Sequence, residues 1–372
     1  MKQKLNVLLL CVLPIYVSNT FMINMVGLSG YFIVQLLLVF CICYGVFEYL
    51  KVKRKIKPFS LAILLYVLMF AYWFCDEKSF TTHIKDLAIA LLGGIPFYAL
   101  NLKEEQFKIT CMFVVFASLL SYYSIRSIMF LENENSYGGG SLILYLLPIG
   151  LFFFRNKKPL YIVVWCMSIF ILTLTSIKRG DILCAMVSII VYFGYIQYKK
   201  KGISIKSVLA IGFVIATLSV VLFQYMESSD LMQARAQETL EGNTSGRDYL
   251  IKKCLDYYSK ASTVEQIFGG GFTTTWRAAG NMAHNDWVEL LVDEGLISVL
   301  IYFSIYVSLF RVIYRHSMPF DIKAILYSIY SIMVISSLIS MLIFSNTTIL
   351  LFMMMGYIFR RYIRERNYIQ SI

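Results

Sequence analysis

The sequence predicts an all-α protein whose helices cross a lipid bilayer many times. Of its 372 residues, 59% are hydrophobic and only 15% are charged, which is far more apolar than a soluble domain. Apolar runs recur along the chain at a length of roughly 17–22 residues, which matches the hydrocarbon thickness of a bilayer. Because these runs are continuous rather than alternating, they favour helices over the strands of a membrane barrel.

We predict twelve membrane spans from these runs, with boundaries set to within a few residues. Their ranges are 5–25, 29–50, 59–75, 87–100, 109–130, 141–154, 159–177, 182–198, 207–225, 296–314, 324–344 and 347–360. The first run has no Ala-x-Ala-like cleavage site, so we interpret it as a retained helix rather than a signal peptide. The run 87–100 contains Gly93-Gly94-Ile95-Pro96, which breaks or tilts helices.

The predicted spans divide the chain into three parts. Residues 1–225 hold nine spans, residues 226–295 form the one long polar segment, and residues 296–372 hold three spans and a basic tail. Basic residues gather in alternate connections, at 51–57, 155–158, 199–201 and 360–361. Since such residues accumulate on the cytoplasmic side, both termini are predicted to be cytoplasmic and segment 226–295 to face outward.

The net charge of +12 does not indicate a nucleic-acid partner. No soluble segment carries a basic helix with interleaved aromatic residues. Seven of the eight cysteines lie in apolar runs, and Cys254 stands alone in the polar segment. With no Cys-x-x-Cys pair and no second histidine at ligand spacing, we predict neither a disulfide nor a metal or other cofactor.

Two arginines lie at the outer ends of predicted spans, where a charge is costly. Arg179 follows Ser176-Ile177-Lys178 in a very short connection, and Arg126 lies near the outer end of the fifth span. Charged groups at such depth usually face a polar cavity or a partner. Alternatively, both side chains extend to the headgroups, or Arg179 pairs with Asp181.

A helix is predicted near 246–259, with Ser245 as its N-cap. Its apolar face would carry Tyr249, Leu250, Cys254, Leu255 and Tyr258. Arg247 would lie in the first turn, beside free backbone N–H groups, where a guanidinium can grip a diphosphate. A surface salt bridge with Asp248 or Glu241 is the alternative. The run Gly269-Gly270-Gly271 lacks the rest of a phosphate-loop motif, so a flexible turn is favoured there.

His284 precedes a second predicted helix of the polar segment. Asp286-Trp287-Val288-Glu289 has the form of a capping box with Asp286 as the N-cap, and Gly295 would end this helix. His284 would then lie ahead of a helix N-terminus at the membrane surface, where it could accept a proton from a sugar hydroxyl or touch a diphosphate. The alternative is a histidine that only hydrogen-bonds its own loop.

These elements together resemble the family of O-antigen ligases and O-antigen (oligosaccharide repeat unit) polymerases. The matching residues are Ser176 to Gly180, Gly246-Arg247, and His284 to Glu289 followed by Gly295-Leu296-Ile297. The resemblance implies a fold related to the C-type glycosyltransferases and metal-independent transfer from an undecaprenyl-diphosphate-linked glycan. It implies that Arg179 and Arg247 bind the diphosphate and that His284 is catalytic. The family often has Ser-Arg-Gly, so the inserted Ile177-Lys178 makes Lys178 a further candidate for the diphosphate contact.

Sugar contacts are predicted from aromatic and polar residues near these motifs. The candidates are Arg126, Tyr137, Tyr249, Trp276, Arg277, Asn285, Trp287 and Glu289. The resemblance further implies the lipid bilayer of the bacterial cytoplasmic (inner) membrane as the location, and a chain-length regulator and a flippase as partners.

The predicted function is polymerisation of lipid-linked repeat units into a surface polysaccharide, such as O-antigen, capsule or exopolysaccharide. A ligase that transfers finished glycan to lipid A core or protein uses the same donor and is the first alternative. A polysaccharide transporter or flippase is the second, although the halves of the chain show no internal repeat. A non-catalytic receptor is the third.

Overall fold

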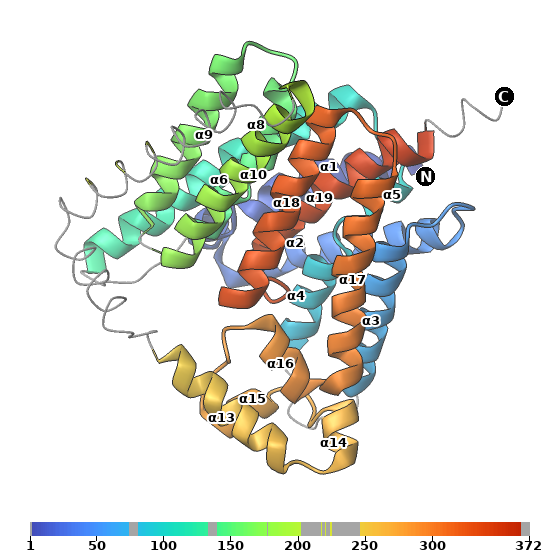
Figure 1. Cartoon of the computed structure of the whole chain (residues 1–372), viewed down its shortest axis with the longest axis vertical. Coiled ribbons are helices and arrows are strands. Elements are labelled where there is room, and N and C mark those ends of the chain that lie inside the picture. The colour runs from blue at the N-terminus through green and yellow to red at the C-terminus, as the bar shows by residue number, and fades with distance from the viewer. Residues whose placement is uncertain are drawn as a thin grey trace.

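The computed structural model describes residues 2–73, 81–132, 140–176, 178–201 and 246–365, together with 217, 220 and 224. All regular elements in these residues are helical, as predicted (Figure 1). They are α1 (Lys2–Val17), α2 (Asn19–Leu50), α3 (Lys57–Trp73), α4 (Thr81–Leu92), α5 (Ile95–Ala99), α6 (Glu104–Glu132), α7 (Gly140–Leu144), α8 (Leu147–Phe154), α9 (Pro159–Leu174), α10 (Arg179–Lys201), α13 (Arg247–Lys260), α14 (Thr263–Phe268), α15 (Thr274–Ala279), α16 (Asp286–Asp293), α17 (Gly295–Arg315), α18 (Phe320–Ile339), η1 (Asn346–Thr348), α19 (Ile349–Phe359) and η2 (Arg360–Glu365).

Five of the described helices are long and apolar enough to cross a membrane. These segments are Gly30–Leu50, Glu104–Ile125, Arg179–Lys200, Gly295–Arg315 and Phe320–Ile339. Shorter apolar helices occupy Asn6–Val17, Lys57–Ala71, Ser141–Phe154 and Pro159–Leu174. A multi-pass helical membrane protein is therefore supported, but the prediction of twelve spans is wrong for the described residues. The predicted span 207–225 lies almost entirely outside them.

Some of the apolar runs are surrounded by other parts of the protein rather than by lipid, which explains their composition. The run 87–100 divides into α4 and α5 at Gly93-Gly94, and α5 packs against α19. A Cβ on Gly94 would lie 2.4 Å from the Phe352 carbonyl oxygen, so the two backbones touch there. All eleven residues of α19 are buried. A helix enclosed on all sides must be apolar on all sides, even when it is too short to span a bilayer.

Helices α10 and α18 run antiparallel and pack along much of their lengths. The Ser188 and Ser328 hydroxyls meet at 2.5 Å, and Lys200 lies 5.9 Å from the Phe320 ring at one end of the pair. The first residue of α10 and the last residue of α18 therefore lie at the opposite end. This polarity defines two ends of the bundle, which we call the Lys200 end and the Arg179 end.

Basic connections gather at the Lys200 end. Arg155 forms an ion pair with Asp321 at 3.7 Å, which joins the α8–α9 connection to the start of α18. The helices α13 to α16 lie beyond the start of α17, at the far end of the molecule from the α8–α9 connection (Figure 1). The basic connection 155–158 and the α13–α16 unit thus occupy opposite ends.

The α13–α16 unit has a small core of its own, formed by Cys254, Ala279, Ala283 and Val292. The predicted helix near 246–259 is α13, and its N-cap is Gly246, with φ 76°; the predicted N-cap, Ser245, lies outside the described residues. The predicted apolar face is only partly right. Cys254 is buried, whereas Tyr249 and Leu255 are exposed. The small core covers only a narrow strip of α13, so the edges of the face stay uncovered.

The N-cap of α16 is Asn285 rather than the predicted Asp286. The Asn285 side-chain oxygen accepts from the N–H groups of Trp287 at 3.0 Å and Val288 at 3.2 Å. Asp286 is buried instead, where its Oδ2 accepts from the Tyr302 hydroxyl at 2.8 Å. Helix α16 ends at Asp293, and Gly295 follows with φ 78°, close to the predicted end.

The glycine run 269–271 forms a turn, as favoured from the sequence. The Gly269 N–H donates to the Glu265 carbonyl, and those of Gly270 and Gly271 donate to the carbonyls of Val292 and Asp293. All three N–H groups are therefore engaged with backbone, which leaves none to cradle a phosphate.

Candidate functional site

The start of α10 holds a lysine against a buried carboxylate. Lys178 Nζ lies 3.6 Å from Asp181 Oδ1 and donates to the Ser141 hydroxyl at 3.0 Å. The Ser141 hydroxyl lies 3.1 Å and 3.0 Å from the two carboxylate oxygens of Asp181. A carboxylate in the first turn is stabilised by the helix dipole. The contacts with Asp181 and Ser141 hold the Lys178 ammonium group at the N-terminus of α10.

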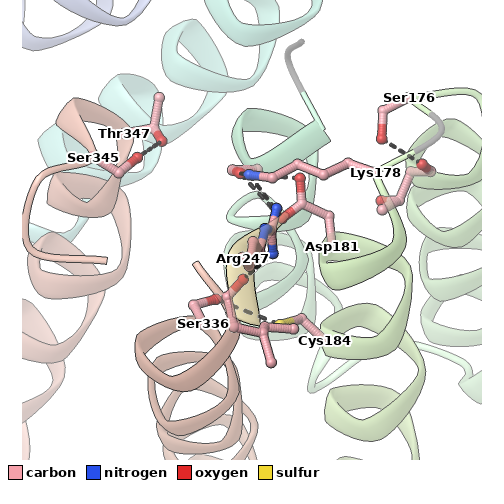
Figure 2. Close-up of polar contacts among 11 residues, drawn as sticks. Ser176, Lys178, Asp181, Cys184, Arg247, Ser336, Ser345 and Thr347 are labelled. Carbon is pink, nitrogen blue, oxygen red and sulfur yellow. Dashed lines mark hydrogen bonds and ion pairs between the residues drawn. The ribbon is translucent and has the colours of Figure 1, made fainter. Parts of the chain in front are cut away.

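Arg247 reaches the same place from the start of α13. One of its guanidinium nitrogens donates to the Ile339 carbonyl at 2.5 Å, at the C-terminal end of α18, where the dipole favours a cation. Figure 2 shows the Arg247 and Lys178 side chains in the same region as Asp181, on which the charges of both act. Burial, and then the nearby charge of Arg179, lower the pKa of Arg247, while Asp181 acts in the opposite direction. Arg179, Asp181 and Arg247 therefore lie close enough to interact.

His284 lies within electrostatic range of these cations. Burial lowers the pKa of His284 below its usual 6.5, and the positive charges of Arg247 and Lys178 lower it further. The imidazole is therefore neutral at pH 7 and able to accept a proton. His284 also has φ 53°, a left-handed conformation that is uncommon outside glycine. Such backbone outliers cluster at functional sites.

Neighbouring side chains hold the His284 loop in this conformation. Glu289 Oε2 accepts from the Ala283 N–H at 2.7 Å, and Glu289 Oε1 accepts from the Thr275 hydroxyl at 2.8 Å. On the other side, the Asn285 amide donates to the Leu338 carbonyl at 2.7 Å. Glu289 and Asn285, two predicted sugar contacts, are thus engaged with the protein itself and position His284.

Two other predicted sugar contacts also make contacts within the protein. The Trp287 indole N–H donates to the Ser337 hydroxyl at 3.1 Å, and its ring packs against Tyr302 with centroids 4.9 Å apart. Arg277 is exposed but donates to the Gly270 carbonyl at 2.8 Å. Trp287 therefore anchors α16 to α17 and α18.

The remaining predicted sugar contacts either have exposed side chains or lie outside the described residues. Trp276 and Tyr249 present exposed rings, and Lys253 Nζ lies 4.5 Å from the Tyr249 ring centroid. The backbone of Arg126 belongs to α6, but its side chain is outside the described part of the chain. Tyr137 and Ile177 also lie outside the described residues.

Two residues of the site were not predicted as site residues. From the sequence, Asp181 was considered only as an alternative partner of Arg179, and Ser141 was not considered. The spacing of Lys178 and Asp181, three residues apart at a helix start, is a signal that they meet. Ser141 offers no such signal, because it joins them from a distant segment.

Four carboxyl groups that follow His284 in the chain, in α16 and directly after it, are buried. They are Asp286, Glu289, Asp293 and Glu294, and burial raises the pKa of each. Both carboxyl oxygens of Glu294 lack a hydrogen-bond partner within the described ranges. In those ranges, no group of three or more His, Cys, Asp or Glu side chains is arranged to hold a metal ion.

A scan against protein families finds no match to this chain, and a search of curated proteins finds no similar sequence. The family resemblance stated above therefore depends on its short motifs alone. Since fold class does not decide an activity, the functional conclusion has to come from the chemistry of the site. That chemistry joins cations suited to a phosphate group with a neutral imidazole suited to a proton.

Proposed function

We propose that this chain is a membrane glycosyltransferase that joins lipid-diphosphate-linked repeat units into a surface polysaccharide. One observation carries the proposal: Lys178 and Arg247 come from separate stretches of sequence, and both lie within electrostatic range of His284 and of Asp181. Cations together with a neutral imidazole are what transfer from a diphosphate donor requires.

The cations suit the donor. When the bond between the anomeric carbon and the diphosphate oxygen breaks, its electron pair leaves with the diphosphate, which gains negative charge. Guanidinium groups bind phosphate oxygens in bidentate fashion, and preorganised cations stabilise such a leaving group in the transition state. Lys178, Arg179 and Arg247 are assigned this role.

His284 suits the acceptor. The acceptor hydroxyl oxygen forms the new bond to the anomeric carbon and gives up its proton, which neutral His284 accepts. A general base of this kind contributes about 10²–10⁴ in rate. The lowered pKa of His284 keeps it in the required neutral form near pH 7.

The position of the site suits a donor that arrives already activated. The site lies at the Arg179 end, away from the basic connections of the Lys200 end. Because basic connections favour the cytoplasm, we orient the site toward the outer face of the bacterial cytoplasmic membrane and both termini toward the cytoplasm. Undecaprenyl-diphosphate-linked repeat units meet the requirement, since no nucleotide sugar is needed outside the cell.

Complementation of a deletion strain tests the proposal, with surface glycan resolved on a gel. Arg247→Ala and His284→Ala should each replace the ladder of long chains by single repeat units, while protein in the membrane stays at its normal amount. Arg277→Ala, which removes an exposed arginine of the same unit, is the matched control and should keep the ladder. Normal ladders in both site variants would refute the assignment. Long chains that remain on the lipid carrier would instead favour the ligase.

A further inference from the structure

Helix α14 is a short, firmly held helix with an exposed apolar face. The Ser262 hydroxyl accepts from the Glu265 N–H at 3.2 Å, and the Glu265 carboxylate accepts from the Ser262 N–H at 3.0 Å, which closes a capping box. Val264, Ile267 and Phe268 lie on one face of this helix and are 66%, 37% and 47% exposed. Such well-fixed apolar side chains mark a contact surface.

The backbone attaches α14 directly to the start of α17. A Cβ on Gly295 would lie 2.4 Å from the Gly269 nitrogen and from the Ile267 carbonyl oxygen, so no side chain fits between the two segments. Gly269 and Gly295 both have positive φ, of 87° and 78°. Figure 1 shows α14 beside the first turns of α17. The level of α14 relative to the bilayer is therefore set by α17.

Helix α17, against which α14 packs, also has an exposed apolar face. Leu296, Leu300 and Phe303 are each between 43% and 56% exposed and follow one another at helical spacing from the first turn of α17. Helix α17 is one of the five segments long and apolar enough to cross a membrane, so this face is expected to contact acyl chains.

We propose that α14 inserts Val264, Ile267 and Phe268 into the outer leaflet of the bilayer, where lipid acyl chains cover them. The apolar face of α14 then adds a lipid contact to the protein contacts that already join the α13–α16 unit to α17 and α18. Amphipathic helices commonly bind membranes in this interfacial manner. The proposal does not depend on the glycosyltransferase assignment, because it concerns only which surface contacts lipid.

Photolabelling of the full chain in lipid nanodiscs tests this contact. The probe is a phospholipid with a diazirine on its acyl chain, and the labelled protein is digested after Lys and Arg. Digestion releases residues 261–277, which include α14, residues 254–260 from α13, and residues 278–311, which include the start of α17. We expect label in 261–277, confined to positions 264–268, and in 278–311 from position 296 onward.

A double variant and its matched control sharpen the result. Val264→Ser with Phe268→Ser should abolish the label in 261–277 and leave that in 278–311. Leu255→Ser with Tyr257→Ser replaces two exposed side chains of α13 and should change the label in neither 261–277 nor 278–311. Absence of label from 261–277 in the native chain, with 278–311 labelled, would overturn the proposal. Protection of α14 from both this lipid and a water-soluble diazirine, with cross-links between chains, would overturn it in favour of a second copy as the occupant.

Discussion

The cationic side chains have different surroundings at the two ends of the bundle. At the Lys200 end, cations meet separate carboxylates: Arg155 lies 3.7 Å from Asp321, and Arg361 pairs with Glu104. Arg361 belongs to this end because it contacts Tyr357, whose ring lies 5.9 Å from the Phe152 ring beside Arg155. At the Arg179 end, Lys178 and Arg247 both interact with Asp181, and Arg179 adds a third positive charge beside Arg247. Within the described residues, the buried carboxylate of Asp181 thus lies near more than one cation.

We infer from this difference that the charges of the Lys200 end serve the structure, whereas those of the Arg179 end are suited to binding a ligand. The ion pair of Arg361 and Glu104 is partly exposed and contributes little energy, and the basic connections of the Lys200 end matter mainly for orientation in the membrane. Like charges held close together repel one another, and the fold has to compensate for that repulsion. An anionic ligand would relieve it, which makes the Arg179 end the place where binding energy is available.

The largest expected effect is on catalysis at the Arg179 end. Arg247→Ala should lower the transfer rate by about 10²–10³, the usual cost of losing one preorganised group that stabilises a developing negative charge. The measurement is chain extension on lipid-diphosphate-linked repeat units by the purified protein. Arg277→Ala serves again as the control. A rate within about twofold of the native one would remove Arg247 from the site.

Asp181 provides the next test, because it competes with any anion for the same cations. Asp181→Asn should tighten binding of inorganic pyrophosphate by on the order of tenfold, since one negative charge beside the ligand disappears. Isothermal titration with the full chain in detergent measures this affinity. Weaker binding would instead identify Asp181 as a residue that mainly holds Lys178 and Arg247 in place.

The buried carboxyls of α16 and of Glu294, the residue after it, contrast with the ion-paired carboxyls of the Lys200 end. Burial, and then Asp293 and Glu289, raise the pKa of Glu294 well above its usual 4.5. The folded state therefore holds this proton more tightly than the unfolded state, so Glu294 favours folding at acid pH and loses that contribution as pH rises. Glu294→Gln should raise stability by about 1–3 kcal/mol near neutral pH.

Thermal unfolding at pH 5 and pH 8 checks this prediction, and the gain should be larger at pH 8. Glu265→Gln, at an exposed capping box of the same unit, is the control and should not stabilise the protein at either pH. A Glu294→Gln gain that is equal at both pH values would show that the carboxyl is not protonated in the folded state.

A smaller effect is expected on the pH dependence of activity. Because protonated His284 cannot act as a base, activity should fall at acid pH, with a midpoint below 6.5. Lys178→Met removes one of the charges that lower the pKa of His284 and should move this midpoint upward by about 0.3–1 pH unit. Rates from pH 4.5 to 8 measure the shift. An unchanged midpoint would mean that Lys178 and His284 do not interact.

The smallest effect is expected at the Lys200 end. Arg361→Ala removes a partly exposed ion pair with Glu104 and should cost at most about 1 kcal/mol of stability. Activity should stay unchanged, as followed by the same extension assay. A strong loss of activity would abolish the distinction between the two ends.

Much of the helical content was predictable, whereas the number of spans was not. Apolar run length predicts α17 and α18 well, because each is a single uninterrupted helix. It fails at 87–100 and 347–360, where protein burial demands the same composition as lipid does. Composition alone does not distinguish the two surroundings, so too many spans were predicted for the described residues.

The candidate cations and His284 were predictable as individual residues, because charge in an apolar chain is conspicuous. The roles of Asn285, Trp287 and Glu289 were not, because a polar or aromatic side chain near a motif can face either a ligand or the protein. Contacts with Leu338, Ser337 and Ala283 decide that they face the protein. Those contacts join positions far apart in the chain or across a turn.

The sequence by itself determined that the chain is helical and suited to a membrane, and which few charges stand out from it. Both follow from composition and periodicity, which are local properties. Only the tertiary structure decided that Lys178 and Arg247 lie near both His284 and Asp181, with Arg179 close to Arg247. Their meeting depends on how α10, α13 and α18 pack, and such packing is a property of the whole fold that no single stretch encodes.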